Sequence, residues 1–188
     1  MTAENARRAA LGEWVSIAPE IRPSSSRNAD GTLRPFYLSR AFTAWPNDEF
    51  ELTVVNSADP YGATPLSKIC IKGHTSWHGE HPIAPGAQKV HFVADTAYDV
   101  TPIAVPFGDV LDKVAGDSYA KWEVGNTQSV LGKNLALFGL AAGENFMEHD
   151  LIYVFRDMLF WGARHVDGRG FDTEEDGPTN LRIPMKRR

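Results

Sequence analysis

The sequence predicts an all-β fold, an antiparallel β-barrel of about eight strands with short helical segments. Three observations predict it. In most apolar segments hydrophobic and polar residues alternate, which is the period of a strand with one buried face. Turn-forming residues separate these segments at short intervals, and almost no helical pattern lies between them. Closure into a barrel also removes the exposed edges that such strands would otherwise present.

Length and composition are those of one globular unit. The chain has 188 residues, so we expect residues 1–188 to form a single β-barrel domain. Hydrophobic residues make up 43% of the chain, which is enough to bury a core and excludes intrinsic disorder. The net charge of −5 gives no attraction for nucleic acid. The single cysteine, Cys70, allows no intrachain disulfide.

The sequence carries no signal for a membrane or for secretion. It has no uninterrupted apolar stretch of about 18 residues, so we expect no membrane insertion. Residues 2–11 read as a short polar helix and lack the continuous apolar core of a signal peptide. The predicted location is therefore the cytoplasm.

Strand patterns dominate the N-terminal half. Segment 36–45 alternates most clearly, because Leu38, Arg40 and Phe42 share one face while Tyr37 begins the other. The strands predicted in this half are 13–17, 36–45, 50–56, 66–77 and 88–94, the last running on through 98.

Turn, helix and strand signals mix in the C-terminal half. We expect helical turns over 107–115, ended by Gly116, and a mostly irregular stretch with a short helix over 131–143. The strongest apolar run, 151–161, alternates and is predicted as one strand. A charged loop is expected over 168–178. The other predicted strands are 103–105, 122–130 and 181–185.

Several short motifs narrow the fold further. Gly12-Glu13-Trp14 is a G-x-W at the first strand, the signature with which lipocalin-like barrels begin. The other segments are Trp14-Val15-Ser16 with Glu20-Ile21-Arg22-Pro23, Tyr37-Leu38-Ser39-Arg40 with Phe42, Leu159-Phe160-Trp161-Gly162, His165, Asp167, Pro178-Thr179-Asn180-Leu181 and Ile183-Pro184-Met185. Taken in this order, they resemble the domain of the "adenomatosis polyposis coli down-regulated" family, whose animal members are membrane-tethered Wnt antagonists.

This resemblance implies a lipocalin-like β-barrel with an apolar pocket, which the animal proteins use to engage lipid. The animal domain also has cysteines near the first Arg-Pro segment and before the third strand pair. Here Pro19 and the turn 59–64 stand in those places. We therefore expect a disulfide-free, single-domain relative without a membrane anchor, in which the fold carries over more safely than the Wnt-related function.

Polar residues within apolar strand patterns are the candidate catalytic groups. Arg40 shares a face with Leu38 and Phe42, and His91 alternates with Val90 and Phe92. Tyr153 and Asp157 share a face with Leu151 and Phe155. The predicted catalytic residues are Arg40, His91, Tyr153 and Asp157, with His91 or Tyr153 moving a proton and Arg40 stabilising an oxyanion.

The same positions also have a purely structural interpretation. An inward-facing charge must be paired, because an unpaired buried charge costs several kcal/mol. A salt bridge from Arg22 or Arg40 to an acidic residue would solve this at one end of the barrel. The acidic residues considered as partners are Glu20, Asp95 and Asp157.

Aromatic and polar residues on neighbouring strands are the candidate ligand contacts. Aromatic faces can stack on flat ligands, and an eight-stranded barrel can be just wide enough for one small molecule. The predicted ligand-binding residues are Arg22, Tyr37, His74, Trp77, Trp122 and Gln128.

We predict no cofactor. His74 and His78 would share a face of an extended strand, with His91 on the next one, so a zinc site formed by these three histidines is the alternative. Against it, His78 and His81 lie in a turn-like stretch, where histidines usually point to water. The sequence also contains no H-E-x-x-H motif.

Two functions remain open at this point. We favour a cofactor-independent lyase or isomerase that acts on an apolar or aromatic small molecule, for example one derived from lignin. The alternative is a non-catalytic protein that binds a lipid or another hydrophobic ligand. In both cases the predicted partner is a small apolar or aromatic ligand, and a homodimer is left open.

Overall fold

The computed structural model describes residues 2–22, 27–32, 34–82, 84–165 and 170–188. Pro23 and Asp167, two residues of the family resemblance, lie outside the described residues, as does part of the predicted charged loop 168–178. In chain order the elements are α1 (Ala3–Ala10), β1 (Gly12–Ser16), β2 (Glu20–Arg22), β3 (Phe36–Ala44), β4 (Glu49–Ser57), β5 (Pro65–Glu80), β6 (Gln88–Pro102), α2 (Val105–Val114), η1 (Gly116–Ser118), β7 (Gln128–Ser129), η2 (Ala136–Phe138), β8 (Phe146–Phe155), β9 (Met158–Trp161) and β10 (Met185–Arg187).

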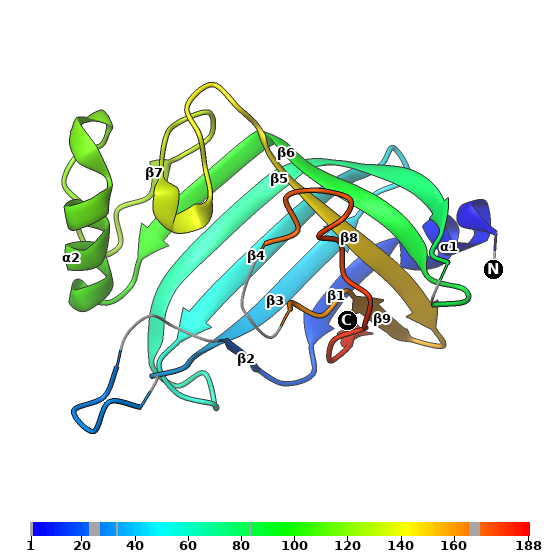
Figure 1. Ribbon diagram of the computed structural model, residues 1–188, viewed down its shortest axis with the longest axis horizontal. Helices are drawn as coiled ribbons and strands as arrows, with labels where there is room; N and C mark the ends of the chain where they lie inside the picture. Colours follow the sequence, from blue (N-terminus) through cyan, green and yellow to red (C-terminus); the bar gives the residue numbers. More distant parts are fainter. Residues whose placement is uncertain (1, 23–26, 33, 83, 166–169) are drawn as a thin grey trace.

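One antiparallel sheet forms the wall of a closed barrel (Figure 1). Within the described residues, ten strands join in the order β1-β10-β9-β8-β6-β5-β4-β3-β2, and β7 adds to β6. The ring closes because β1 pairs with β10 on one side and with β3 on the other. Eight strands therefore make the barrel, and the predicted all-β, lipocalin-like fold is confirmed.

The two main helices lie at opposite ends of the barrel (Figure 1). Helix α1 is capped by Thr2, whose hydroxyl accepts a hydrogen bond from the Asn5 N–H at 3.3 Å. Its C-terminal end is tied to the barrel by Trp14, whose indole N–H donates to the Ala10 carbonyl at 2.8 Å. The Trp14 ring is fully buried, so it closes the α1 end of the barrel.

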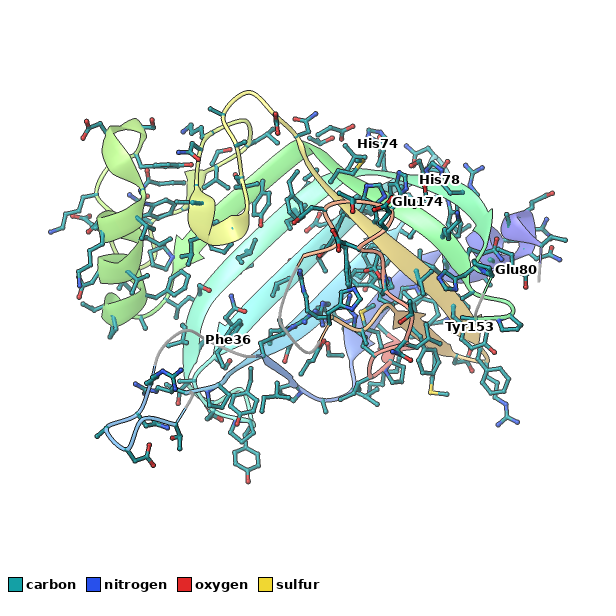
Figure 2. All side chains as sticks on the ribbon, viewed as in Figure 1. Phe36, His74, His78, Glu80, Tyr153 and Glu174 are labelled. Carbon is teal, nitrogen blue, oxygen red and sulfur yellow. The ribbon has the colours of Figure 1, made fainter. Side chains whose placement is uncertain are left out.

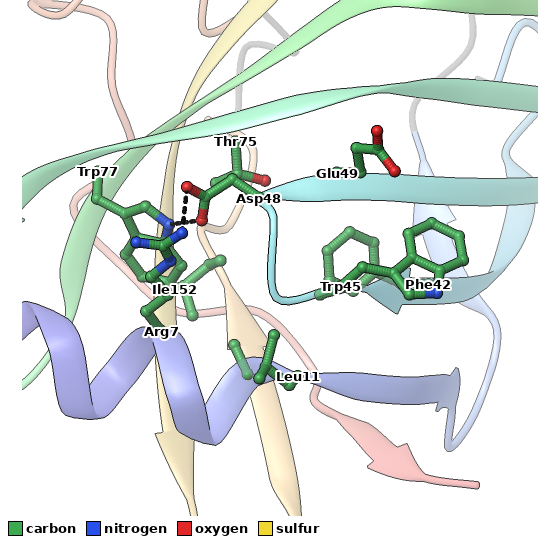
Figure 3. Close-up of a pocket in the computed structure, with 11 residues that line it drawn as sticks. Arg7, Leu11, Phe42, Trp45, Asp48, Glu49, Thr75, Trp77 and Ile152 are labelled. Carbon is green, nitrogen blue, oxygen red and sulfur yellow. Dashed lines mark hydrogen bonds and ion pairs between the residues drawn. The ribbon is translucent and has the colours of Figure 1, made fainter.

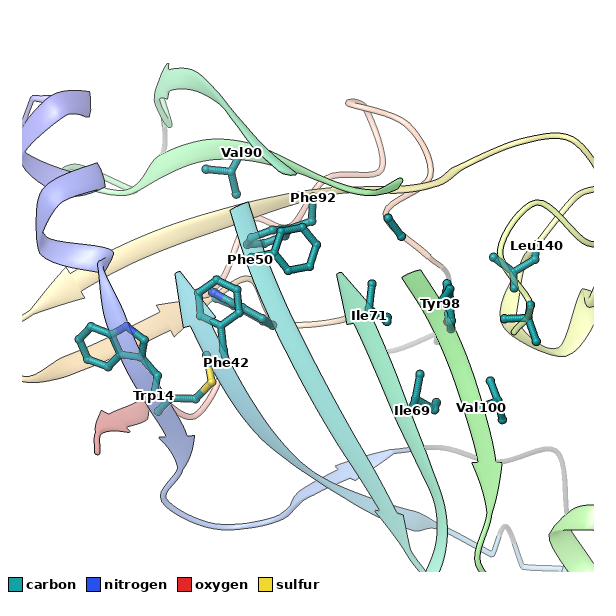
Figure 4. Packing of buried hydrophobic residues seen from close by; sticks show 14 of the residues in the cluster. Trp14, Phe42, Phe50, Ile69, Ile71, Val90, Phe92, Tyr98, Val100 and Leu140 are labelled. Carbon is teal, nitrogen blue, oxygen red and sulfur yellow. The ribbon is translucent and has the colours of Figure 1, made fainter. Parts of the chain in front are cut away.

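Aromatic side chains fill much of the interior. Figure 4 shows the buried residues running along the barrel from Trp14, past Phe42 and Phe50, to Tyr98. The Phe42 and Trp161 rings meet edge to face with centroids 4.8 Å apart, and such contacts add about 0.5–1.5 kcal/mol each beyond the area they bury. This cluster forms one wall of the site described below.

The predicted single strand 151–161 is wrong, because the run is a hairpin. Strand β8 pairs with β9 in a register that sets Phe155 opposite Met158, leaving only Arg156 and Asp157 in the turn. Arg156 has a φ of 54°, the left-handed conformation that a tight hairpin turn requires. Because the turn contains no glycine or asparagine, the two apolar strands look like one in the sequence.

Three other predicted strands also differ from the structure. Segment 103–105 forms no strand, because β6 ends at Pro102 and α2 begins at Val105. Within the segment 122–130, only β7 is a strand. Trp122 lies in a loop, and its side chain is buried. Its backbone N–H donates to the Asp112 carboxylate at 2.8 Å, which holds the loop in place. Burial of loop residues therefore produced a strand-like pattern. The last strand, β10, begins at Met185, where the predicted segment 181–185 ends.

Candidate functional site

A buried network of charged side chains lies on the inner side of the barrel wall. We call it the arginine network, and its members are Glu20, Arg22, Arg40, Asp150 and Arg182. Glu20 is its centre, because its carboxylate lies 2.7 Å from the Arg40 guanidinium and 3.1 Å from that of Arg22. Arg182 lies 3.7 Å from Glu20 and 3.1 Å from Asp150. The network therefore links β2 and β3 to β8 through the interior.

Strand register explains why these residues meet. On β3, Leu38 and Phe42 are buried, and the alternation places Arg40 on the same inner face. Strand β2 pairs with β3 so that Glu20 lies opposite Leu38. The predicted buried salt bridge from Arg22 or Arg40 to Glu20 is confirmed, and both arginines take part in it.

Asp150 is completely enclosed by its neighbours. One carboxylate oxygen accepts the backbone N–H groups of Leu151 at 2.7 Å and Gly162 at 2.8 Å, and the other faces Arg182. A Cβ atom at position 162 would overlap Pro178 and crowd the Asp150 carboxylate, so the close approach needs glycine there. Because residue 162 has no side chain, its backbone N–H can come close enough to donate to the buried Asp150 carboxylate.

Burial and neighbouring charges shift the pKa values of this network. Burial raises the pKa of Asp150 to about 6, although Arg182 acts in the opposite direction. Burial also opposes ionisation of Glu20, but the surrounding arginines, Arg40 first, bring its pKa below its usual value. Burial, together with the charge of Arg182, lowers the pKa of Arg40 to about 9. Arg40 therefore stays protonated at neutral pH.

A hollow inside the barrel adjoins the arginine network. We call it the inner hollow. Its enclosed space is about 20 Å³, and a wider volume of about 310 Å³ includes open solvent at its mouth. Its walls are mostly apolar, with the Glu148 carboxylate as the charged group among them. The lining residues are Phe50, Leu52, Ile71, Phe92, Ala94, Phe146, Glu148 and Trp161.

Trp161 connects the hollow to the network. The guanidinium carbons of Arg182 and Arg40 lie 5.4 Å and 5.9 Å from the centroid of its ring. The indole Nε1 of Trp161 and the Nε of Arg182 are both buried, and neither has a hydrogen-bond partner in the described part of the chain. Two N–H donors are therefore left without acceptors beside the hollow.

Glu148 brings a second ion pair to the same side of the barrel. Its carboxylate lies 2.9 Å from Arg164, whose guanidinium carbon is 5.0 Å from the centroid of the Phe171 ring. On β8, Glu148 and Asp150 are two residues apart and face the interior together. Burial raises the pKa of nearby Tyr98, and the Glu148 carboxylate raises it further.

Two of the predicted catalytic residues, His91 and Tyr153, lie on the outer face of the wall. His91 alternates with the core residues Val90 and Phe92, so its ring points outward. Tyr153 contacts the outward-facing Phe155 and Phe160 at the α1 end of the barrel (Figure 2). The expectation that both residues lean inward is wrong, because each lies at a position whose side chain points to the outer face of its strand.

Asp157, the third such residue, lies in the exposed β8–β9 turn and faces no pocket. It was placed on an inner face because the hairpin was read as a continuous strand. Asp95, another considered partner for a buried arginine, instead holds the His74 ring nitrogen at 3.0 Å on the surface. Of the predicted catalytic set, only Arg40 lies in the interior.

His91 belongs to a group that we call the outer histidine cluster: His78, His91 and His149. The His78 and His91 rings stack with centroids 3.7 Å apart, and His91 meets His149 at 4.1 Å. Burial lowers the pKa of His91 to about 4, and the neighbouring histidines add to this. Glu174 interacts with His91 electrostatically and pairs with Lys89 at 2.6 Å.

The predicted ligand-binding residues are spread over the molecule. Arg22 is in the arginine network, whereas Tyr37 lies on the opposite face of β3 from Arg40. The Gln128 side chain holds the backbone of Ala120 through its amide, with contacts of 2.9 Å and 3.0 Å. Trp122 packs on Tyr119 below α2, in a part of the core remote from the inner hollow. Of the predicted ligand-binding residues, only Arg22 belongs to the arginine network, and the structure does not gather the others into one site.

Trp77 lines a different and smaller hollow, beside α1 (Figure 3). Its indole N–H donates to Asp48 at 3.1 Å, and Arg7 from α1 pairs with the same carboxylate at 2.6 Å. Both contacts are visible in Figure 3. They fasten α1 across the end of the barrel, so Trp77 has a structural partner there.

Sequence reasoning missed Glu148, Asp150, Trp161 and Arg182 as site residues. Glu148 and Asp150 alternate in phase with Ile152 and Val154, and an earlier start of the predicted strand would have included them. Arg182 offers no such signal, because it comes from the irregular segment between β9 and β10.

Within the described residues, no group of three or more His, Cys, Asp or Glu side chains is placed to hold a metal ion. His74 is engaged by Asp95, while His78 and His91 stack on each other. None of the described helices is both long and apolar enough to cross a bilayer.

The chain matches no protein-family model and no curated protein. The resemblance to the "adenomatosis polyposis coli down-regulated" family therefore stays a prediction, and the geometry of the site must support any functional proposal.

Proposed function

We propose that this chain binds a compact apolar or aromatic small molecule in the inner hollow. The observation that carries the proposal is the composition of the hollow: aromatic walls from Phe50, Phe92 and Trp161, with Glu148 at one side. Small-molecule sites typically combine mostly apolar walls with a few placed polar groups. The predicted family resemblance, with its lipid-engaging domain, also favours an apolar ligand.

The size of the hollow favours a compact ligand over a long acyl chain. Ligand pockets usually measure about 300–1,000 Å³, whereas the enclosed space of this hollow is about 20 Å³, so a ligand would have to move side chains of the wall or occupy the open mouth. Because so little space is enclosed, a single ring at the mouth needs less rearrangement than a long chain, and the aromatic side chains of the wall can stack on it.

A matched pair of variants tests the proposal. Ala94→Ile should fill the hollow, whereas Leu52→Ile keeps the volume of its wall, and thermal melts would show that both fold. Isothermal titration with toluene, indole, phenylacetate and octanoate would measure binding. We expect the aromatic probes to bind and Ala94→Ile to weaken them by about tenfold or more, a loss of about 1.4 kcal/mol. No binding to the wild type, or equal binding to Ala94→Ile, would contradict the proposal.

A second candidate function is acid–base catalysis on the bound molecule, as in a cofactor-independent lyase or isomerase. The observation that favours it is the pair of carboxyl groups on one face of β8, where the pKa of Asp150 is raised to about 6. A carboxyl group that titrates near neutral pH can both donate and accept a proton. Glu148 is the group of the pair that lines the hollow.

Catalysis has its own test. Lignin-type phenolic acids would be incubated with the wild type and with Glu148→Gln, and products followed by NMR. If the chain is an enzyme of this class, Glu148→Gln should lose turnover and still bind the aromatic probes. Binding without any turnover in the wild type would leave a carrier as the function.

A further inference from the structure

The arginine network contains more positive than negative charge. Three guanidinium groups, those of Arg22, Arg40 and Arg182, share two carboxylates, those of Glu20 and Asp150. Each of the three arginine side chains is at most 10% exposed, so water can do little to compensate for the difference. A buried charge without a partner is strongly unfavourable. Among the residues that the structure describes, one positive charge in the network therefore lacks a counter-charge.

Repulsion among the arginines is consistent with this imbalance. After burial, the charge of Arg182 is the largest influence that lowers the pKa of Arg40. Arg182 also lowers the pKa of Arg22, which falls to about 10 and for which burial is again the main cause. The adjacent Arg164–Glu148 pair contributes one charge of each sign. An added anion would relieve the repulsion among the three network arginines.

Two unused hydrogen-bond donors lie at the edge of this network. The Arg182 side chain is 8% exposed and Trp161 is 4% exposed, yet the Arg182 Nε and the Trp161 Nε1 have no partner among the described residues. Buried N–H groups are nearly always paired in proteins, so such atoms call for an acceptor. The Arg182 guanidinium stacks 5.4 Å from the centre of the Trp161 ring, and that ring lines the inner hollow.

We infer that the ligand of the inner hollow is a monoanion, an aromatic or apolar carboxylate, whose oxygens accept the N–H groups of Trp161 and Arg182. This inference rests on the proposed binding function and adds the chemical class of the ligand. One negative charge matches the surplus of the network, and a carboxylate has two oxygens for the two donors. A neutral ligand would leave the surplus charge, and a dianion would reverse it.

Probes that differ only in charge test the inference. Phenylacetate and phenylacetamide have nearly the same shape, and both would be titrated at one ionic strength by calorimetry. We expect phenylacetate to bind at least about tenfold more tightly. Equal binding would overturn the inference and leave the proposed function standing, whereas failure of both probes and of toluene would overturn the proposed function itself.

Small anions provide the second arm. The surplus charge could be met by chloride or formate in place of an aromatic acid, so both would be titrated alone. We expect each to bind much more weakly than phenylacetate, because neither has a ring to fill the apolar part of the hollow. An inorganic or one-carbon anion that binds as tightly as phenylacetate would overturn the inference.

The Trp161→Phe variant tests the role of the indole N–H separately from that of the aromatic ring in the wall of the hollow. Phenylalanine keeps an aromatic ring and removes the N–H, so the variant should lose most of the preference for phenylacetate over phenylacetamide. Trp45→Phe is the matched control, because Trp45 is 41% exposed and lies outside the inner hollow. Arg182→Lys should reduce the preference in the same way. Full preference in Trp161→Phe would overturn the assignment.

Discussion

The arginine network and the outer histidine cluster occupy opposite faces of the same wall, and they handle ionisable groups differently. On β8 the two meet in consecutive residues, since Asp150 points inward and His149 outward. Inside, opposite charges lie close together, and the arginines around Glu20 hold the pKa of its carboxyl group below the usual value. Outside, like groups stack, and burial together with the neighbouring histidines lowers the pKa of His91 to about 4, so this ring stays neutral at pH 7. The wall thus carries paired arginines and carboxylates on its inner side and stacked histidines on its outer side.

The largest effect should follow from removing the centre of the inner network. Glu20→Gln leaves three buried arginines without their shared counter-charge, and we expect a loss of about 3–5 kcal/mol in the free energy of unfolding. Urea denaturation would measure it. Glu4→Gln is the matched control, since its pair with Arg8 has the same 3.1 Å separation as Arg22 and Glu20 but is exposed. A loss below about 1 kcal/mol in Glu20→Gln would place it with exposed pairs and contradict the comparison.

Because of Asp150, the free energy of unfolding should increase as pH falls. Its pKa in the folded chain is raised to about 6, so the folded state takes up a proton before the unfolded state does. Its contribution to stability therefore rises as pH falls from about 6 to 4. Relative to Asp150→Asn, the wild type should gain about 1–2 kcal/mol between pH 7 and pH 4 in urea titrations. A constant difference between the two proteins would show that Asp150 does not titrate in this range.

His91 should produce the opposite sign over the same range. Its folded pKa lies near 4, so as pH falls below about 6.5 the unfolded chain is protonated first and stability is lost. Since the ring is partly exposed, screening limits the loss to about 1 kcal/mol. His91→Gln should remove this part of the slope, while His74→Gln, which alters a histidine outside the cluster, should retain it. Identical slopes in the wild type and His91→Gln would contradict the prediction.

The smallest effect is expected for the ion pair over the outer histidines. Lys89 and Glu174 lie 2.6 Å apart, closer than any ion pair of the arginine network, but Glu174 is 65% exposed. Glu174→Gln should therefore change the free energy of unfolding by less than about 0.5 kcal/mol. A loss comparable to that of Glu20→Gln would show that distance, and not burial, governs these pairs.

Part of the candidate site could be predicted from local patterns. Arg40 sits between Leu38 and Phe42 in a clean alternation, which predicts an inward charge that needs an acidic partner, and Glu20 was one of three candidates. His91 shows the limit of this reasoning. It also alternates with apolar residues, but Val90 and Phe92 occupy the inner face and leave His91 outside. Alternation divides a strand into two faces, but it does not say which face points into the barrel.

The sequence by itself determined the class of fold, because strand periodicity and turn residues act locally and need no distant partner. It also determined that charges near Arg40 would have to be paired. Only the tertiary structure decided which groups meet there. Arg182 and Asp150 approach Glu20 from segments far along the chain, and the Trp161 ring joins them to the hollow because β9 turns back on β8. Such contacts depend on barrel closure and strand register, which are set by packing over the whole molecule, so the local sequence does not show which partners will meet.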